Sequence, residues 1–114
     1  MLKPIPKVAR EYVYKRDKGI CRICRRPVSE NEAHVHHLYH RNSVIPADLE
    51  IPHVKGNNHP YNLVLVCAEC HAILHNGKDL PDRLRRYMVQ YNKELEYLYP
   101  FSPELKEWLK DNTR

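Results

Sequence analysis

The chain has 114 residues, of which 42% are hydrophobic and 29% are charged. Its formal net charge of +5 at pH 7 is compatible with an anionic partner such as nucleic acid, and equally with an ordinary basic surface that binds nothing. A chain of this length suffices for one small domain with a modest core, so we expect a single domain over residues 1–114 that is stabilised by an added element such as a metal. The N-terminal stretch lacks the apolar core of a signal peptide, and the longest apolar run, residues 63–68, is too short to cross a bilayer, so we expect a cytoplasmic protein without membrane contact.

The first third of the chain predicts a helix and then a strand. Residues 6–17 carry Val8, Tyr12 and Val13 at helical spacing, and Gly19 is expected to end this helix. A turn with two cysteines follows, and residues 33–40 predict a strand. Residues 41–61 are rich in proline and asparagine and predict a long polar connection, which in a compact domain is usually functional or mobile.

The next segment predicts a second strand followed directly by a second helix. Asn62 precedes a continuous apolar run, residues 63–66, whose length and β-branched content favour a buried strand. Residues 67–76 then predict a short helix, with Gly77 as its C-terminal stop.

The C-terminal part predicts two more helices. Asp79 and Asp82 suit the cap and the first turn of a helix whose apolar residues recur at helical spacing, namely Leu80, Leu84, Tyr87, Met88, Tyr91, Leu95 and Leu98. A last short helix is expected to begin near Ser102-Pro103. We expect this region to pack on the same chain rather than on a second one, because the core is otherwise small.

Two Cys-x-x-Cys pairs contain all the cysteines of the chain: Cys21, Cys24, Cys67 and Cys70. Each pair can offer two thiolates from one tight turn, and four sulfurs form the tetrahedral shell that structural zinc prefers. Because protein atoms would fill all four positions, this zinc is expected to stabilise the fold and to take no part in chemistry. Disulfides, a redox pair and an iron–sulfur cluster are the alternatives, and the missing secretory signal disfavours the first two.

The histidines all lie between residues 34 and 75. His36 and His37 are neighbours on the predicted strand, so their side chains should point to opposite sides and serve different roles. His71 and His75 are four residues apart on the predicted helix, so both imidazoles lie on one face and could hold a metal ion. A lone histidine is more often a surface or core residue, whereas these four together favour a site. No partner can be assigned to the remaining histidines: His34, His40, His53 and His59.

The order of His36-His37, Asn62, His71 and His75 resembles the motif of the HNH, or His-Me finger, endonucleases. The two flanking Cys-x-x-Cys pairs resemble the zinc-anchored branch of that family. The most specific stretch is Asn62-Leu-Val-Leu-Val-Cys67-Ala-Glu-Cys70-His71-Ala-Ile-Leu-His75, and the resemblance covers about residues 12–76. It implies an α+β fold, in which a small ββα-metal, treble-clef-like core is held by the zinc on its four cysteines. Helices would flank this core on both sides, with a C-terminal helical extension over 77–114.

The same resemblance implies hydrolysis of DNA phosphodiester bonds with the help of one divalent cation. His37 would be the general base that activates water, and Asn62 would fix the loop and strand that carry it. The catalytic cation would be bound by His36, His71 and His75. Many relatives have aspartate where this chain has His36, and an all-imidazole site is softer, so Mn²⁺, Ni²⁺ or Zn²⁺ would compete with Mg²⁺.

Several arginines near the motif are candidate phosphate contacts: Arg22, Arg25, Arg26 and Arg41. For any one of them, a solvated surface position is the better explanation, whereas their clustering beside the motif favours phosphate contact. No base-reading module is recognisable, so we expect little sequence preference. The rival interpretations are a catalytically inactive, zinc-bound nucleic-acid binding module and a zinc-stabilised protein-interaction domain. The sequence leaves open whether the protein is a monomer or a homodimer.

Overall fold

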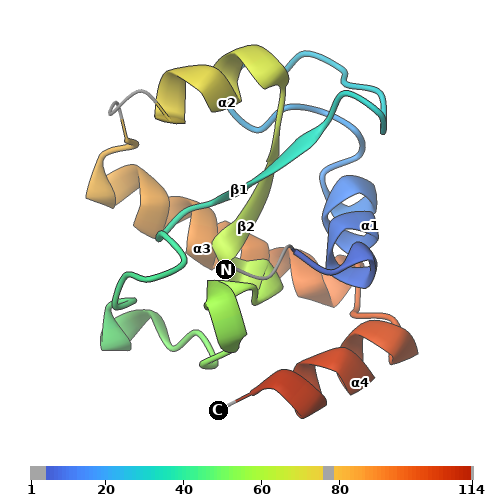
Figure 1. Ribbon diagram of the computed structural model, residues 1–114, viewed down its shortest axis with the longest axis vertical. Helices are drawn as coiled ribbons and strands as arrows, with labels where there is room; N and C mark the ends of the chain where they lie inside the picture. Colours follow the sequence, from blue (N-terminus) through green and yellow to red (C-terminus); the bar gives the residue numbers. More distant parts are fainter. Residues whose placement is uncertain (1–4, 76–78, 114) are drawn as a thin grey trace.

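A computed structural model of the chain describes residues 5–75 and 79–113. Four α-helices and one two-stranded sheet make up its regular structure (Figure 1): α1 Lys7–Arg16, β1 His34–His37, β2 Leu63–Val66, α2 Ala68–His75, α3 Asp82–Leu98 and α4 Pro103–Asn112. The predicted order of elements is therefore confirmed, although β1 is shorter than the expected strand over 33–40. The predicted helix stop at Gly77 lies outside the described residues.

The two strands and α2 form a continuous ββα unit. β1 and β2 pair antiparallel, with His34 opposite Val66 and His37 opposite Leu63. α2 follows β2 after a single residue and contacts β1, so the helix with its two histidines lies beside the strand with the other two. This arrangement is an α+β fold with a ββα core, as the resemblance implied.

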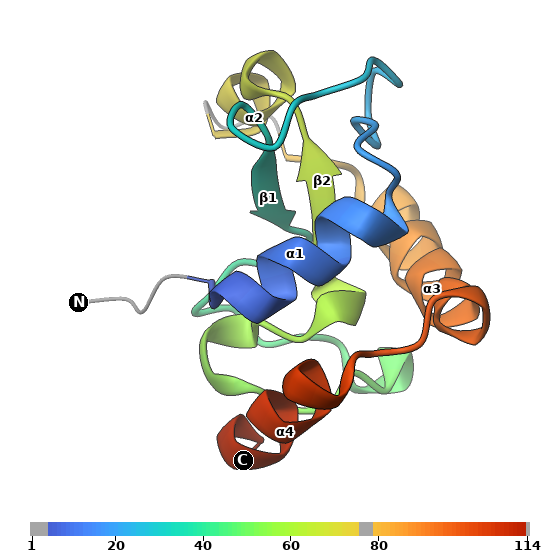
Figure 2. The ribbon, with the colours of Figure 1, turned by 90° about the vertical axis from the view of Figure 1, so that its right-hand side faces the viewer.

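All four residues of β2 are buried, because the sheet is covered on both faces. Leu63 and Leu65 face α1 and α4, where they pack with Val13 and Leu105 in one hydrophobic cluster. Figure 2 shows α1 crossing the sheet with α4 beneath it and α3 on the other side of β2. The alternate residues of β2 pack in a second cluster with Cys21, Cys67, Cys70, Leu38 and residues of α3. A strand buried on both sides explains its continuous apolar sequence.

The long connection between the strands is more ordered than its sequence indicates. It contains three 3₁₀ helices, Ala47–Leu49, Lys55–Asn57 and Pro60–Asn62. Leu49 and Val54 are buried and attach the connection to the two clusters. Three short turns therefore replace the expected irregular loop.

The C-terminal helices pack on the core of the same chain, but the predicted inward face of α3 is partly wrong. Its buried residues are Met88, Val89 and Asn92, whereas Leu84, Tyr87, Tyr91 and Leu98 are exposed. Helical spacing identified an apolar stripe, but the buried face is rotated because Asn92 finds buried hydrogen-bond partners.

Of the two expected helix N-caps, the one at α4 is present and the one at α3 is not. Asp79 lies outside α3, whose N-cap position is Pro81 without a side-chain hydrogen bond, so the predicted Asp79 cap is wrong. The Asp79 carboxylate instead contacts His40, with 2.8 Å between its Oδ2 and His40 Nε2. Ser102 caps α4 as expected, since its Oγ accepts a hydrogen bond from the Leu105 N–H at 3.1 Å. Among the described residues, no helix is both long and apolar enough to cross a membrane.

Candidate functional site

The four cysteines converge although more than 40 residues separate the two pairs. Their sulfur atoms all lie within 4.8 Å of one another, and Cys24 Sγ is 3.7 Å from Cys67 Sγ. Zinc–sulfur bonds of about 2.3 Å in a tetrahedron place two sulfurs about 3.8 Å apart, so the set fits a zinc ion. A disulfide needs about 2.05 Å between sulfurs, and the cysteines are free thiols in this structure.

Backbone geometry at both cysteine turns favours thiolates. The Cys24 N–H points at Cys21 Sγ at 3.5 Å, and the Cys70 N–H points at Cys67 Sγ at 3.4 Å. A hydrogen bond from the Arg26 side chain lowers the pKa of Cys24 to about 6. Burial instead raises the pKa of Cys70 to about 12, so its ionisation calls for a cation beside it. The four cysteines could therefore hold a structural zinc ion, which would tie the chain before β1 to the start of α2.

The histidines of β1 alternate between the two faces of the sheet, as the strand geometry predicted. His36 faces α2, with its ring centroid 5.9 Å from that of His71. His37 points to the other face, where its Nε2 lies 2.7 Å from Asn58 Oδ1. The two adjacent imidazoles are therefore in different environments.

His71 and His75 bring their ring nitrogens together at the surface of α2. Their Nε2 atoms are 3.0 Å apart. Two nitrogen ligands bound at about 2.1 Å to one ion lie about 3.0–3.4 Å apart for angles between 90° and tetrahedral, so this pair has the spacing of metal ligands. Among residues 5–75 and 79–113, the four cysteines are the one group of three or more His, Cys, Asp or Glu side chains whose ligand atoms lie close enough together to hold a metal ion. The histidines thus supply a converged pair with the His36 ring nearby.

Burial lowers the pKa of His36 and of His71 and so favours their neutral form, which is the form that binds metals. Burial, together with the neighbouring His71 and His37, lowers the pKa of His36 to about 4. The pKa of His71 is lowered by burial and by the nearby His75 and His34. Of the groups that shift the pKa of His36, Asp79 alone raises it and so favours the charged form.

His37 is buried, and its surroundings define which nitrogen can accept a proton. Burial lowers its pKa below the usual imidazole value, the Asn58 hydrogen bond opposes this, and Arg41 and His40 lower it again. When Asn58 Oδ1 accepts a hydrogen bond, His37 Nε2 carries the proton, and Nδ1 keeps the free lone pair. Asn58 is itself 2% exposed, so this contact lies inside the protein.

Asn62 connects the two ends of the inter-strand connection. Its Oδ1 accepts a hydrogen bond from the Tyr39 N–H, and its Nδ2 donates to the Tyr39 and Asn57 carbonyl oxygens, each at 2.9 Å. The side chain is fully buried. Asn62 therefore holds the backbone two residues after His37, and it also immediately precedes β2.

The arginines that were expected to contact phosphate differ in their surroundings. Arg22 is 8% exposed, and its guanidinium donates to Asp17 Oδ1 at 2.9 Å and to Asn92 Oδ1 at 2.8 Å. The expectation for Arg22 is thus wrong, because a buried ion pair holds its side chain inside the fold. Arg26 pairs with Glu69 at the surface. Arg25 is exposed, and Arg41 lies close enough to His37 to lower its pKa.

Two residues beside the histidines were missed from the sequence. His34 stacks on His71 with 4.7 Å between ring centroids and 18° between planes. Its place two residues before His36, on the same face of a strand, was a usable signal. Asn58 carried no such signal, because its contact with His37 depends on the folding of the connection.

A cysteine cluster that fits zinc, histidines on β1 and α2, and a buried asparagine between the strands together define a ββα-metal fold. The family model for HNH endonucleases matches residues 21–77, which is half of the chain and includes all of these residues. The chain belongs to the HNH endonuclease family. Its function is therefore of the kind found in nucleases, which bind or cleave nucleic acid. No curated protein and no solved structure matches the chain significantly.

Proposed function

We propose that the protein is a metal-dependent endonuclease that hydrolyses DNA phosphodiester bonds with little sequence preference. Family membership supports nuclease chemistry, and the net charge of +5 suits a polyanionic substrate. The observation that carries the proposal is the pairing of His71 Nε2 with His75 Nε2 at 3.0 Å beside the ring of His36. A nucleic-acid binding module has no need of such a converged pair.

His37 is proposed to be the general base. Its lowered pKa keeps the imidazole neutral at physiological pH, and the Asn58 contact leaves Nδ1 free to take a proton from water. Asn62 supports this role indirectly, because it fixes the backbone at Tyr39 just after the base. Neither Asn58 nor Asn62 touches the reacting atoms in this proposal.

His36, His71 and His75 are proposed to hold the catalytic cation. A divalent ion supplies positive charge where negative charge develops on the phosphate and on the leaving oxygen. Neutral imidazoles suit Mn²⁺, Ni²⁺ and Zn²⁺ as well as, or better than, Mg²⁺. The cysteine cluster would bind a separate, structural Zn²⁺.

The proposed weak sequence preference follows from the kinds of contact that the arginines offer. Arg41, whose charge lowers the pKa of the nearby His37, is proposed to contact the scissile phosphate, and the exposed Arg25 a flanking phosphate. Contacts to phosphate position a nuclease but carry no base information.

Supercoiled plasmid is a direct substrate for the test. Purified protein is incubated with Mg²⁺, Mn²⁺, Ni²⁺ or Zn²⁺ in turn, and each reaction is repeated with excess chelator added just before the DNA. Nicked or linear plasmid that appears only with a divalent ion supports the proposal. Intact plasmid with every ion, despite salt-sensitive DNA binding, would favour a catalytically inactive binding module.

A further inference from the structure

A hollow between the first cysteine turn and α3 has no role in the site described above. Its walls are Ile23 and Arg25 on the cysteine turn and Leu84, Tyr87 and Tyr91 on α3. Leu80 and the buried Arg22 and Met88 complete the lining. α3 lies beyond the residues matched by the family model, so this hollow combines the matched cysteine turn with a helix outside the matched region.

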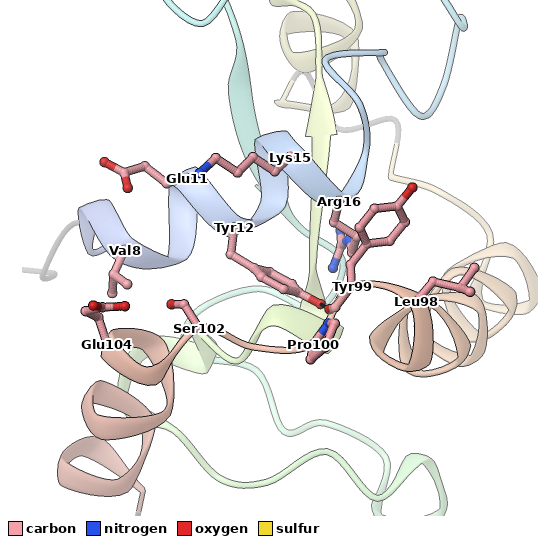
Figure 3. Close-up of a pocket in the computed structure, with 10 residues that line it drawn as sticks. All are labelled: Val8, Glu11, Tyr12, Lys15, Arg16, Leu98, Tyr99, Pro100, Ser102 and Glu104. Carbon is pink, nitrogen blue, oxygen red and sulfur yellow. Dashed lines mark hydrogen bonds between the residues drawn. The ribbon is translucent and has the colours of Figure 1, made fainter.

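The charged residues of this hollow differ from those of three other hollows on the described surface. The one in Figure 3, between α1 and the start of α4, has Glu11 and Glu104 beside Lys15 and Arg16. A second, beside α1, has Glu11 and Glu30 among its cations, and a third, on the far part of α3, has Glu94 and Glu96 beside Lys93. The hollow beside the cysteine turn has no carboxylate in its lining; Arg22 is paired with the buried Asp17, and the exposed Arg25 supplies the positive charge. It is therefore suited to an anionic occupant.

Two tyrosines give the same hollow flat apolar surfaces. Tyr87 is 65% exposed and Tyr91 is 40% exposed, and their rings are nearly parallel, at 15° and 6.3 Å between centroids. The Arg22 guanidinium lies 5.2 Å from the centre of the Tyr91 ring and supports it from the protein side. Exposed aromatic rings beside cationic groups are the features with which proteins bind unpaired bases and their phosphates.

The hollow begins next to the histidine site. Asp79, the residue before Leu80, contacts His40 at 2.8 Å and acts on the pKa of His36. The start of α3 is also bound to the segment after β1, since Tyr39 Oη donates to Asp82 Oδ1 at 2.8 Å. The Leu80 side of the hollow is thus joined to the segment that follows β1.

We propose that the hollow formed by Ile23, Arg25, Leu84, Tyr87 and Tyr91 binds a single-stranded segment of the nucleic-acid substrate. Bases stack on the two tyrosines, and Arg25 contacts the backbone. This inference rests on the proposed nuclease function for the identity of the polymer, and it names an unpaired strand as part of the substrate. A second copy of the chain is a poorer occupant, because a two-fold interface would bring the same arginines against each other.

The test is binding of labelled oligothymidylate, measured by fluorescence anisotropy without added divalent ions, beside a hairpin duplex of the same length. Tyr87→Ala should raise the Kd for oligothymidylate about five-fold or more, the effect of losing roughly 1 kcal/mol of stacking. Tyr87→Phe should bind normally, because it keeps the ring. Tyr97→Ala is the matched control: Tyr97 is 91% exposed on the same helix but lines the hollow with Glu94 and Glu96, so binding should be unchanged.

Equal affinities of Tyr87→Ala and Tyr97→Ala for oligothymidylate would overturn the inference. So would an equal loss for the duplex, or a Tyr87→Ala change from dimer to monomer in sedimentation with oligothymidylate binding unaltered. Failure of the two proposals is distinguishable. If the wild type does not cut plasmid but oligothymidylate binding depends on Tyr87, the nuclease proposal fails and the binding site stands. If the wild type cuts plasmid but oligothymidylate binding does not depend on Tyr87, the nuclease proposal stands and the proposed binding site fails.

Discussion

Removal of the Asn62 side chain tests how the histidine of β1 is held. Asn62 is fully buried and makes three hydrogen bonds of 2.9 Å to the backbone of Tyr39 and Asn57. Asn62→Ala deletes these bonds and leaves an N–H and two carbonyl groups without their partner. The segment that follows His37 would then be free to shift.

The expected loss of stability is large for a domain of this size. A buried polar group without a partner costs about 1–3 kcal/mol, and water that enters the new cavity recovers part of that cost, so we expect a total of about 3–5 kcal/mol. At about 4 °C per kcal/mol for a domain of this size, Tm should fall by about 12–20 °C. Cleavage, assayed well below the lowered Tm, should fall as well, because the base is no longer held in place.

Asn92→Ala is the matched control for this experiment. Asn92 is 1% exposed and also makes three hydrogen bonds, to Arg22, Tyr61 and Leu63. Urea unfolding should show a comparable loss of stability for both variants, whereas the rate of plasmid nicking should fall much further in Asn62→Ala. Equal nicking by the two variants at equal stability would refute a specific role of Asn62 in holding the base.

Three further predictions concern stability and the cysteine site. Burial lowers the pKa of His59 to about 4. Because the unfolded imidazole binds its proton near pH 6.5, His59 should contribute a decrease of about 3 kcal/mol in the free energy of unfolding as the pH falls from 6.5 towards 4, in addition to the decrease from the lowered pKa of His36. Urea titrations that give a constant value over this range would contradict the assignment. Asp17→Asn should cost about 3–5 kcal/mol in the same assay, since it removes the carboxylate that accepts from Arg16 and Arg22 in the interior; a loss under 1 kcal/mol would show that this network is not critical. Cys70→Ser should lose one equivalent of zinc by elemental analysis and unfold without cooperativity, and a cooperative, zinc-free variant would show that the site is not structural.

The local part of the fold could be predicted because its signals lie within a few residues of one another. The apolar run at 63–66 defined β2, and the four-residue interval between His71 and His75 placed both on one face of α2. Two short cysteine motifs were sufficient to predict that the thiols converge, because each turn fixes two ligands and a metal of known geometry joins the turns.

Contacts between distant parts of the chain could not be predicted. Arg22 lies among charged residues that are usually exposed, yet its side chain is buried. In the interior it donates hydrogen bonds to Asp17 and to Asn92, which is 70 residues away in the sequence. The same contact explains why the inward face of α3 is rotated from its apolar stripe. Asp79 has the sequence features of a helix cap but contacts His40 instead.

The most direct test of the account is the initial rate of plasmid nicking by His37→Ala beside the wild type, with the most effective divalent ion and with DNA affinity measured for both. The proposed role of His37 predicts that the variant folds and binds DNA normally but cuts no faster than the chelator control. A variant that nicks plasmid at the wild-type rate would show that His37 is not the base and would contradict the mechanism proposed here.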